Sequence, residues 1–228
     1  MTIWSVVLTV INSNNKIYPK KRKVLITVLG KIKMNNIQEK AEYCLNCKVK
    51  PCSKGCPLGN DIPSFIKLIK EEKYKEAYEK LLETTVLQPI CGRICPHEKQ
   101  CQGSCVRGIK GEPVSIGNLE QFVGDMAIKE NWKIQTPDVE LNKHVAIVGG
   151  GPAGITAAAF LRRKGYKVTI YEKYQELGGI LVHGIPEFRL PKEIVRETIR
   201  KILNTGIQVI YGAELGKNIT LEELKEQY

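Results

Sequence analysis

The chain has 228 residues, of which 43% are hydrophobic and 7% aromatic, as in an ordinary soluble globular protein with room for two modest domains. Its formal charge of +11 would suit binding to nucleic acid or membrane, but residues 1–33 hold seven basic side chains and no acidic one. The rest of the chain has 28 basic and 24 acidic residues. A membrane-spanning helix needs about 18 consecutive apolar residues, and no stretch of the sequence approaches that length. We therefore expect a cytoplasmic protein with no nucleic-acid or membrane partner.

The chain opens with a basic leader over residues 1–36, which lacks a helical or strand period and which we expect to be disordered or non-native. Met34 is an alternative start, because a polar, helix-compatible stretch follows it. Residues 37–141 carry all the cysteines and several helical patterns, and they are expected to form an all-α domain. A linker follows at about Gln135–Asn142, where the period is lost.

One helix is predicted over Ile62–Thr84, where apolar side chains recur at the 3.6-residue period of an amphipathic helix. Asn60 or Asp61 is placed to cap its N-terminus. Pro63 falls in the first turn, where proline costs no hydrogen bond.

The eight cysteines all lie between Cys44 and Cys105, in two groups of four. The groups read Cys44-x2-Cys47-x4-Cys52-x3-Cys56-Pro57 and Cys91-x3-Cys95-Pro96-x4-Cys101-x3-Cys105. Clustered cysteines in a reducing compartment usually hold metal, and thiolates favour iron–sulfur clusters, Cu(I) or zinc. Zinc is the alternative to a cluster, but the sequence has one CxxC pair and lacks the second pair of a zinc site. The first group also differs from the x2, x2, x3 run of bacterial ferredoxins.

From His144 the pattern changes to strand, glycine turn, helix and strand, which is typical of a parallel α/β sheet. Gly149, Gly151 and Gly154 form G-x-G-x-x-G, which gives a tight turn, close approach of a pyrophosphate and close helix packing. The pyrophosphate would lie at the helix N-terminus, where the free N–H groups favour anions. A second strand ends at Glu172, at the spacing of a ribose-binding carboxylate. The motif alone does not decide between FAD and NAD.

The stretches CLNCKVKPCSKGCPLGNDIP and ICGRICPHEKQCQGSC resemble the N-terminal domain of glutamate synthase small subunits. The same domain occurs in dihydropyrimidine dehydrogenase and in the NADPH-binding subunit of electron-bifurcating transhydrogenases. The eight cysteine spacings, CPxGxDIP and CGRxCP carry the resemblance, which runs from about Met34 to the C-terminus. It implies an all-α iron–sulfur domain followed by a partial α/β, Rossmann-like FAD-binding domain over residues 142–228.

The resemblance further implies two [4Fe–4S] clusters whose ligands interleave between the two groups. Carried over by position, the ligands of one cluster are Cys44, Cys47, Cys52 and Cys105, and those of the other are Cys56, Cys95, Cys101 and Glu120. Gln121 is the competing fourth ligand of the second cluster, and Glu120 would otherwise be a carboxylate on a helix surface. Cys91 is left without a cluster position.

For the second domain the resemblance implies FAD, held by Gly149, Gly151, Gly154, Glu172 and, in the Leu177-Gly178-Gly179 segment, Gly179. A third strand is predicted at Gln208–Tyr211, followed by a short helix from Leu221. Such a domain needs further strands and a later NADPH-binding domain. We therefore expect that the chain is a truncated form of a longer protein and is inactive alone.

The implied function is that of an NAD(P)H-dependent oxidoreductase subunit. Electrons would pass from NADPH through FAD and the two clusters to a large catalytic subunit or another redox partner, as in glutamate synthase. No residue is expected to act as nucleophile or general base, because cofactors carry such chemistry. The alternatives are a dihydropyrimidine dehydrogenase-type subunit, a non-catalytic electron carrier, an inactive fragment, or a zinc-stabilised regulatory module.

Overall fold

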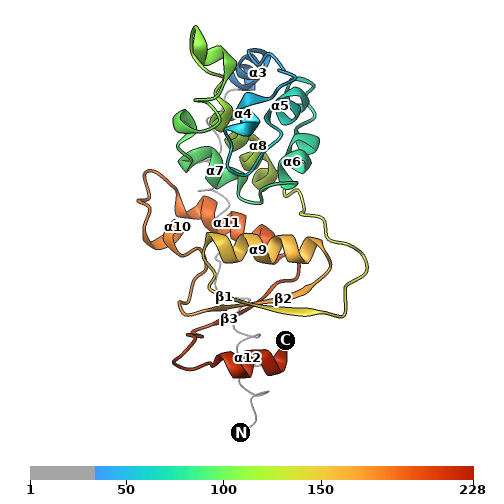
Figure 1. The fold of residues 1–228 in the computed structure, drawn as a ribbon, viewed down its shortest axis with the longest axis vertical. Coiled ribbons are helices and arrows are strands. Elements are labelled where there is room, and N and C mark those ends of the chain that lie inside the picture. The colour runs from blue at the N-terminus through green and yellow to red at the C-terminus, as the bar shows by residue number, and fades with distance from the viewer. Residues whose placement is uncertain (1–33) are drawn as a thin grey trace. The chain divides into compact units, whose positions relative to one another are not determined.

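The computed structural model describes residues 34–228, and the expectations for residues 1–33 lie outside that range. The described residues belong to one compact unit, with a helical part followed by an α/β part built on a parallel sheet (Figure 1). This confirms the expected fold class, an all-α domain followed by a partial Rossmann-like domain. Among the described residues, no helix is both long and apolar enough to cross a lipid bilayer.

The helical part has as its first described element α3, which starts at the first described residue, Met34. Its elements in chain order are α3 (Met34–Glu42), α4 (Pro51–Lys54), α5 (Ile62–Lys70), α6 (Tyr74–Leu82), α7 (Gln88–Ile94), the 3-10 helices η2 (His97–Lys99) and η3 (Val106–Ile109), and α8 (Ile116–Lys129). The long helix α8 lies at the centre, and α3, α6 and α7 all contact it. Its apolar side is almost fully buried, for example at Leu119 and Val123.

The prediction of a single helix over Ile62–Thr84 is wrong, because α5 and α6 are separated at Glu71–Lys73. Glu72 adopts a left-handed conformation with φ of 57°, which reverses the chain direction and lets α5 and α6 pack on each other. The 3.6-residue period continued through the break because each short helix buries its own apolar side. Phe65 and Leu81, one on each helix, are both buried.

The predicted cap of α5 is only partly right. Asp61 occupies the N-cap position, but its side chain makes no capping hydrogen bond. The carboxylate instead pairs with Lys50, whose Nζ lies 2.7 Å from Oδ1. Burial alone would raise the pKa of Asp61, but the hydrogen bond from Lys50 brings it below its usual value. This pair ties the loop before α4 to the start of α5.

Helices α7 and α8 lie unusually close because each presents a glycine to the other. A Cβ added to Gly92 would lie 2.4 Å from the backbone N of Gln121, and one added to Gly124 would lie 2.5 Å from the N of Pro89. Beside this contact Arg93 forms a two-pronged ion pair with Asp125, at 2.7 and 2.8 Å, and both side chains are buried. The close approach brings the cysteines at the end of α7 next to the first half of α8.

The α/β part has three parallel strands in the order β1-β2-β3. The predicted strands are confirmed, and the elements are β1 (His144–Val148), α9 (Pro152–Arg163), β2 (Lys167–Glu172), α10 (Ile180–His183), α11 (Lys192–Leu203), β3 (Gln208–Tyr211) and α12 (Leu221–Gln227). In the register, Ile147 lies beside Ile170 and Ile170 beside Val209.

Helices cover both faces of the sheet (Figure 1). Val168 and Ile170 point into the main core, which includes residues of α9 and α11. Tyr171, from the other face of β2, packs with Leu224 of α12 in a separate small cluster. The alternation of side chains along β2 therefore builds a three-layer α/β/α arrangement.

The α/β part is joined to the helical part through α11 and α9. Lys201 of α11 donates hydrogen bonds to the carbonyl of Ala127, at 3.0 Å, and to that of Trp132, just beyond the end of α8. Burial lowers the pKa of Lys201 to about 8. Arg163 of α9 donates to the carbonyl of Leu82 at the end of α6. The linker thus connects two parts that share backbone contacts and a continuous apolar core.

Candidate functional site

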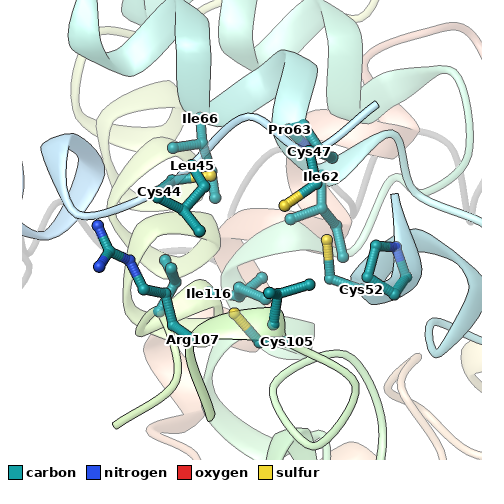
Figure 2. Close-up of a pocket in the computed structure, with 13 residues that line it drawn as sticks. Cys44, Leu45, Cys47, Cys52, Ile62, Pro63, Ile66, Cys105, Arg107 and Ile116 are labelled. Carbon is teal, nitrogen blue, oxygen red and sulfur yellow. The ribbon is translucent and has the colours of Figure 1, made fainter. Parts of the chain in front are cut away.

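Four cysteines surround one pocket in the helical part. Cys44 and Cys47 come from the loop after α3, Cys52 from α4, and Cys105 from the N-cap position of η3 (Figure 2). The pocket encloses about 350 Å³, part of it open to solvent, and its other walls are mainly apolar side chains such as those of Leu45, Pro51, Ile62, Ile66, Val114 and Ile116. The structure therefore brings together the four cysteines assigned to the first cluster, although Cys105 is far from the others in sequence.

The loop that carries the first cysteines depends on two left-handed residues. Asn46, between Cys44 and Cys47, has φ of 52°, and Lys50, before α4, has φ of 48°. Asparagine tolerates this conformation better than most residues. The ion pair between Lys50 and Asp61 fixes the second turn, and the Ser53 side chain accepts a hydrogen bond from the N–H of Ile62. The loop geometry is thus set by α5.

Basic side chains lie around the same pocket. Lys70 donates to the carbonyl of Cys44 at 2.8 Å, and Arg107, one of the lining residues, donates to the carbonyl of Tyr43 at 3.0 Å. The guanidinium of Arg107 also lies 4.2 Å from the centre of the Tyr43 ring. These cations favour negative charge in the pocket, which is the charge that four thiolates would bring.

Burial raises the pKa of two thiols of this group and so favours their protonated form. Burial raises the pKa of Cys52 to about 11, against hydrogen bonding from the backbone N–H of Ser53. Burial also raises the pKa of Cys44, although the N–H of Asn46 and the charge of Lys70 oppose it. A bound metal must therefore displace protons here, as it does at cysteine sites generally.

The second set of expected ligands also gathers in one place. Cys56 follows α4, Cys95 occupies the C-cap position of α7, Cys101 follows η2, and Glu120 lies in the second turn of α8. They are close enough to affect one another electrostatically. Burial is the largest cause that raises the pKa of Cys101, and the nearby Glu120 and Cys56 raise it further, to about 12. Likewise the pKa of Glu120 is raised to about 8 by burial and by Cys95.

Glu120 is a buried carboxyl group with an oxygen atom that lacks a hydrogen-bond partner in the described part of the chain. The residue is 5% exposed, and within residues 34–228 its Oε1 atom has no hydrogen-bond partner. An unpaired buried carboxylate is costly, so such groups are normally paired or bound to metal. Gln121, the competing ligand, interacts instead with Asp125. Burial raises the pKa of Asp125, and the hydrogen bond with the Gln121 side chain opposes this effect. Glu120 is thus buried in α8 and does not lie on the helix surface.

Cys91 lies beside this group but differs from its members. Its thiol donates to Cys95, which raises the pKa of Cys91 and lowers that of Cys95 to about 7. The Oγ1 atom of Thr85 lies 3.9 Å from the Cys91 sulfur. Cys95 is thus the sulfur that is poised to be a thiolate, and Cys91 is its hydrogen-bond donor.

In neither set do the donor atoms converge on a single metal ion. Within residues 34–228, no three His, Cys, Asp or Glu side chains are close enough together to hold a single metal ion. A zinc ion draws its sulfur ligands to about 2.3 Å from one centre. Both sets of donors are therefore more widely spaced than a preformed zinc site.

The glycine turn between β1 and α9 leaves open space where a dinucleotide motif needs it. A Cβ added to Gly149 or Gly151 would meet no atom within 4 Å, whereas one added to Gly154 would lie 1.9 Å from the carbonyl O of Gly149. The third glycine is therefore needed for packing. The first has φ of 97°, which suits glycine, and the second leaves the N-terminus of α9 uncovered.

Glu172 and Gly179 both lie against this turn. The carboxylate of Glu172, at the end of β2, accepts hydrogen bonds from the N–H of Gly150 at 2.7 Å and from that of Tyr174 at 2.9 Å. Gly179 has φ of 50°, and a Cβ there would come within 3.1 Å of the Cα of Gly151. All five residues expected at the FAD site thus meet at the end of the first two strands. Glu172 also has a structural task that the spacing did not reveal.

Sequence reasoning missed two features of the cysteine region. Gly92 and Arg93 belong to CGRxCP, but their parts in packing α7 on α8 depend on Gln121 and Asp125, far along the chain. The second feature is His97, which lies between Cys95 and Cys101. It is half-buried, and its Nε2 atom is fully buried without a hydrogen-bond partner among residues 34–228. Its position between two cysteines was the only signal in the sequence.

Two family models match the chain in the regions just described. The model "dihydropyrimidine dehydrogenase domain II, 4Fe-4S cluster" matches residues 21–132, and an "NAD(P)-binding Rossmann-like domain" matches residues 147–183. The first match covers both groups of cysteines and Glu120. The second begins in β1 and ends with α10, so it contains the glycine turn, Glu172 and Gly179.

Curated relatives match along most of the chain. The glutamate synthase [NADPH] small chain of Azospirillum brasilense is 36% identical over 212 residues, which are 92% of this chain and 44% of that protein. The NAD-dependent dihydropyrimidine dehydrogenase subunit PreT of Escherichia coli O157:H7 is 40% identical over 189 residues, which are 83% of this chain and 46% of that protein. The chain thus spans less than half the length of these relatives. It belongs to the family of iron–sulfur oxidoreductases that includes glutamate synthase small chains and PreT-type dihydropyrimidine dehydrogenase subunits.

Proposed function

We propose that this chain is the iron–sulfur and FAD-binding portion of an NAD(P)H-dependent oxidoreductase subunit that passes electrons to a partner protein. The single observation that carries the proposal is the pair of donor sets in the helical part, one of four thiols and one of three thiols with the unpaired carboxyl of Glu120. Names of the relatives point to the same class of activity.

The donor sets fit four-iron clusters in their chemistry. Thiolates are the usual ligands of such clusters. The cations around the first pocket suit the negative charge of such a cluster. Cys44, Cys47, Cys52 and Cys105 would hold one cluster, and Cys56, Cys95, Cys101 and Glu120 the other. An oxygen ligand is harder than a thiolate, so the second cluster would differ from the first in potential.

The α/β part fits the adenosine and pyrophosphate end of FAD. The open space at Gly149 and Gly151 leaves room for the pyrophosphate at the N-terminus of α9. A carboxylate offers about four acceptor positions, and Glu172 uses two of them in the fold, so it can still accept from a ribose hydroxyl. Gly179 would let the segment before α10 lie close to the dinucleotide.

When bound, FAD and the clusters would take up the two electrons of a hydride and pass them on one at a time. The residues of this chain bind and tune these groups. The apolar walls of the first pocket limit access of water to the cluster, and Arg107 and Lys70 balance its charge. The partner would be a large catalytic subunit, as glutamate synthase or a dihydropyrimidine dehydrogenase would require, and we place the protein in the cytoplasm.

The test is electron paramagnetic resonance of the anaerobically purified chain after reduction. Dithionite should produce two distinct cluster signals. The Cys52→Ala variant should lose one of them and the Cys101→Ala variant the other, because each removes a ligand of a different set. A chain that gives no cluster signal, or in which both variants lose the same signal, would contradict the proposal.

Comparing two reductants in the same experiment separates an enzyme from a passive carrier. If the complete protein transfers electrons from NADPH, adding NADPH and FAD to it should reduce the clusters as dithionite does. If dithionite reduces the clusters and NADPH does not, although FAD is bound, the protein would be a carrier instead.

A further inference from the structure

The segment of residues 176–185, which follows β2 and includes α10, lies directly against the glycine turn. The N–H of Gly178 donates to the carbonyl of Gly150 at 2.8 Å. A Cβ added to Gly179 would lie 3.1 Å from the Cα of Gly151. The position of this segment therefore affects the turn that is proposed to hold the pyrophosphate.

The segment has little stability of its own. Helix α10 has four residues, which make a single turn, and so short a helix does not form in water without outside contacts. Gly178 and Gly179 have φ of 120° and 50°, and glycine loses more conformational freedom on ordering than any other residue. Contacts from another element must therefore order the segment.

Helix α11, which packs against α10, supplies these contacts through two basic side chains (Figure 1). The Nζ atom of Lys192 donates to the carbonyl of Leu181 at 2.8 Å and to that of Ile185. The Nε atom of Arg196 donates to the carboxylate of Glu176 at 2.7 Å. Lys192 and Arg196 are four residues apart and so lie on one face of α11. They hold the two ends of the segment.

Lys192 is expected to have the larger effect of the two. The last carbonyls of a helix lack partners within it, and a lysine can bind them, as Lys192 does at the end of α10. Its backbone N–H also donates to the carboxylate of Glu187 at 3.1 Å, which closes the loop between α10 and α11. The side chains of Arg196 and Glu176 are 39% and 30% exposed, and exposed ion pairs contribute little.

We propose that Lys192 is a positioning residue for the dinucleotide, because it holds α10, and with it Gly178 and Gly179, against the glycine turn. The inference rests on the proposed function, since it needs FAD to bind at that turn. Lys192 acts through main-chain carbonyls of the segment. A site that is ordered before the ligand arrives loses less conformational entropy on binding, so its affinity is higher.

The test combines titration of the full chain with FAD and with ADP and hydrogen exchange of the ligand-free chain. Lys192→Met keeps the apolar stem and removes the donors, whereas Lys192→Arg keeps a cationic donor. Lys164→Met is the matched control. Lys164 is the exposed C-cap residue of α9, at the opposite end of that helix from the glycine turn.

We expect Lys192→Met to bind both ligands about tenfold more weakly, because the loss of one hydrogen bond from a charged donor corresponds to about this factor. The amide N–H groups of residues 176–185 should exchange faster, while the rest of the α/β part keeps its protection, as in local opening of one segment. Lys192→Arg should restore most of the affinity, and Lys164→Met should bind like the parent. Equal affinity in Lys192→Met and the parent would overturn the inference, as would an equal loss in Lys192→Arg.

Hydrogen exchange decides the matter if Lys192→Met is less stable than the parent. Faster exchange throughout the α/β part, without a larger effect in residues 176–185, would show that Lys192 stabilises the fold in general, and it would overturn the inference. A parent chain that binds neither FAD nor ADP would instead contradict the FAD site of the proposed function, because the glycine turn would then hold no dinucleotide.

Discussion

Cys91 and Cys105 illustrate how much the surroundings of a thiol decide its role. Cys105 faces the first pocket with three other cysteines, whereas Cys91 donates to Cys95 and contacts Thr85. We predict that Cys91→Ala retains both clusters and that Cys105→Ala loses one, because only Cys105 is a proposed ligand. Iron and sulfide per chain, with the resonance spectrum of each variant, provide the measurement. Loss of a whole cluster in Cys91→Ala would show that the ligands are misassigned.

Substitutions at Gly151 and Gly154 distinguish an effect on dinucleotide binding from an effect on stability. A methyl group at Gly151 meets nothing within 4 Å in the protein, so Gly151→Ala should melt like the parent. It would occupy the space meant for the pyrophosphate, and loss of one or two charge-assisted hydrogen bonds should weaken FAD or ADP binding about tenfold or more. Titration of the ligand, followed by fluorescence or calorimetry, measures the effect.

Gly154→Ala is the contrasting variant. Its methyl group would lie 1.9 Å from the carbonyl O of Gly149, so the strand–turn–helix unit must shift. We expect a lower melting temperature in addition to weaker binding. Equal ligand affinity in Gly151→Ala and the parent would show that the dinucleotide does not approach this turn.

The sequence was most informative about residues whose chemistry is local. The G-x-G-x-x-G turn and Glu172 could be predicted because strand, turn and helix follow one another within one segment. The packing of Arg93 and His97 could not, because each depends on a distant residue of α8, Asp125 in one case and Gly117 in the other. Pairing of residues this far apart is decided by packing, which one sequence does not reveal.

Among the elements, the contact between α7 and α8 controls the distance between Cys95 and Glu120. Gly92→Ala would place a methyl group 2.4 Å from the backbone of Gln121. Overpacking of this kind lowers the free energy of unfolding by about 1–3 kcal/mol. Removal of a glycine from a helix raises it by about 1 kcal/mol or less, so the loss is larger. We predict a lower free energy of unfolding, measured by urea titration, together with partial loss of the second cluster.

Gly111→Ala is the control for this prediction. Gly111 lies between η3 and α8, and a methyl group there would have ordinary contacts at 3.8 and 3.9 Å. The free energy of unfolding and the cluster content should stay near those of the parent. If Gly92→Ala behaves the same way, the close approach of α7 and α8 does not matter for the second site.

Helix and strand positions were predicted with uneven success for a physical reason. The three strands could be located because buried parallel strands are short apolar runs bounded by glycine or polar residues. The break between α5 and α6 could not, because the apolar period continues across it. The left-handed conformation of Glu72 is imposed by packing of the two helices, since glutamate has no local preference for it.

At the scale of the whole molecule, the helical and α/β parts share a core, and Lys201 and Arg163 bridge them by hydrogen bonds to the ends of α8 and α6. This contact would hold the proposed cluster sites and the dinucleotide site in a fixed relation, as electron transfer between them requires. The sheet has three strands among the described residues, with β1 and β3 at its edges. The relatives are more than twice as long as the matched segment.

The central claim is that the two donor sets hold iron–sulfur clusters, and elemental analysis of the anaerobically purified chain tests it most directly. Two [4Fe–4S] clusters require about eight irons and about eight acid-labile sulfides per chain, with no stoichiometric zinc. Glu120→Ala should lower these values, because it removes the oxygen ligand of the second cluster. Stoichiometric zinc without sulfide would contradict the account and assign the thiols to a structural zinc site.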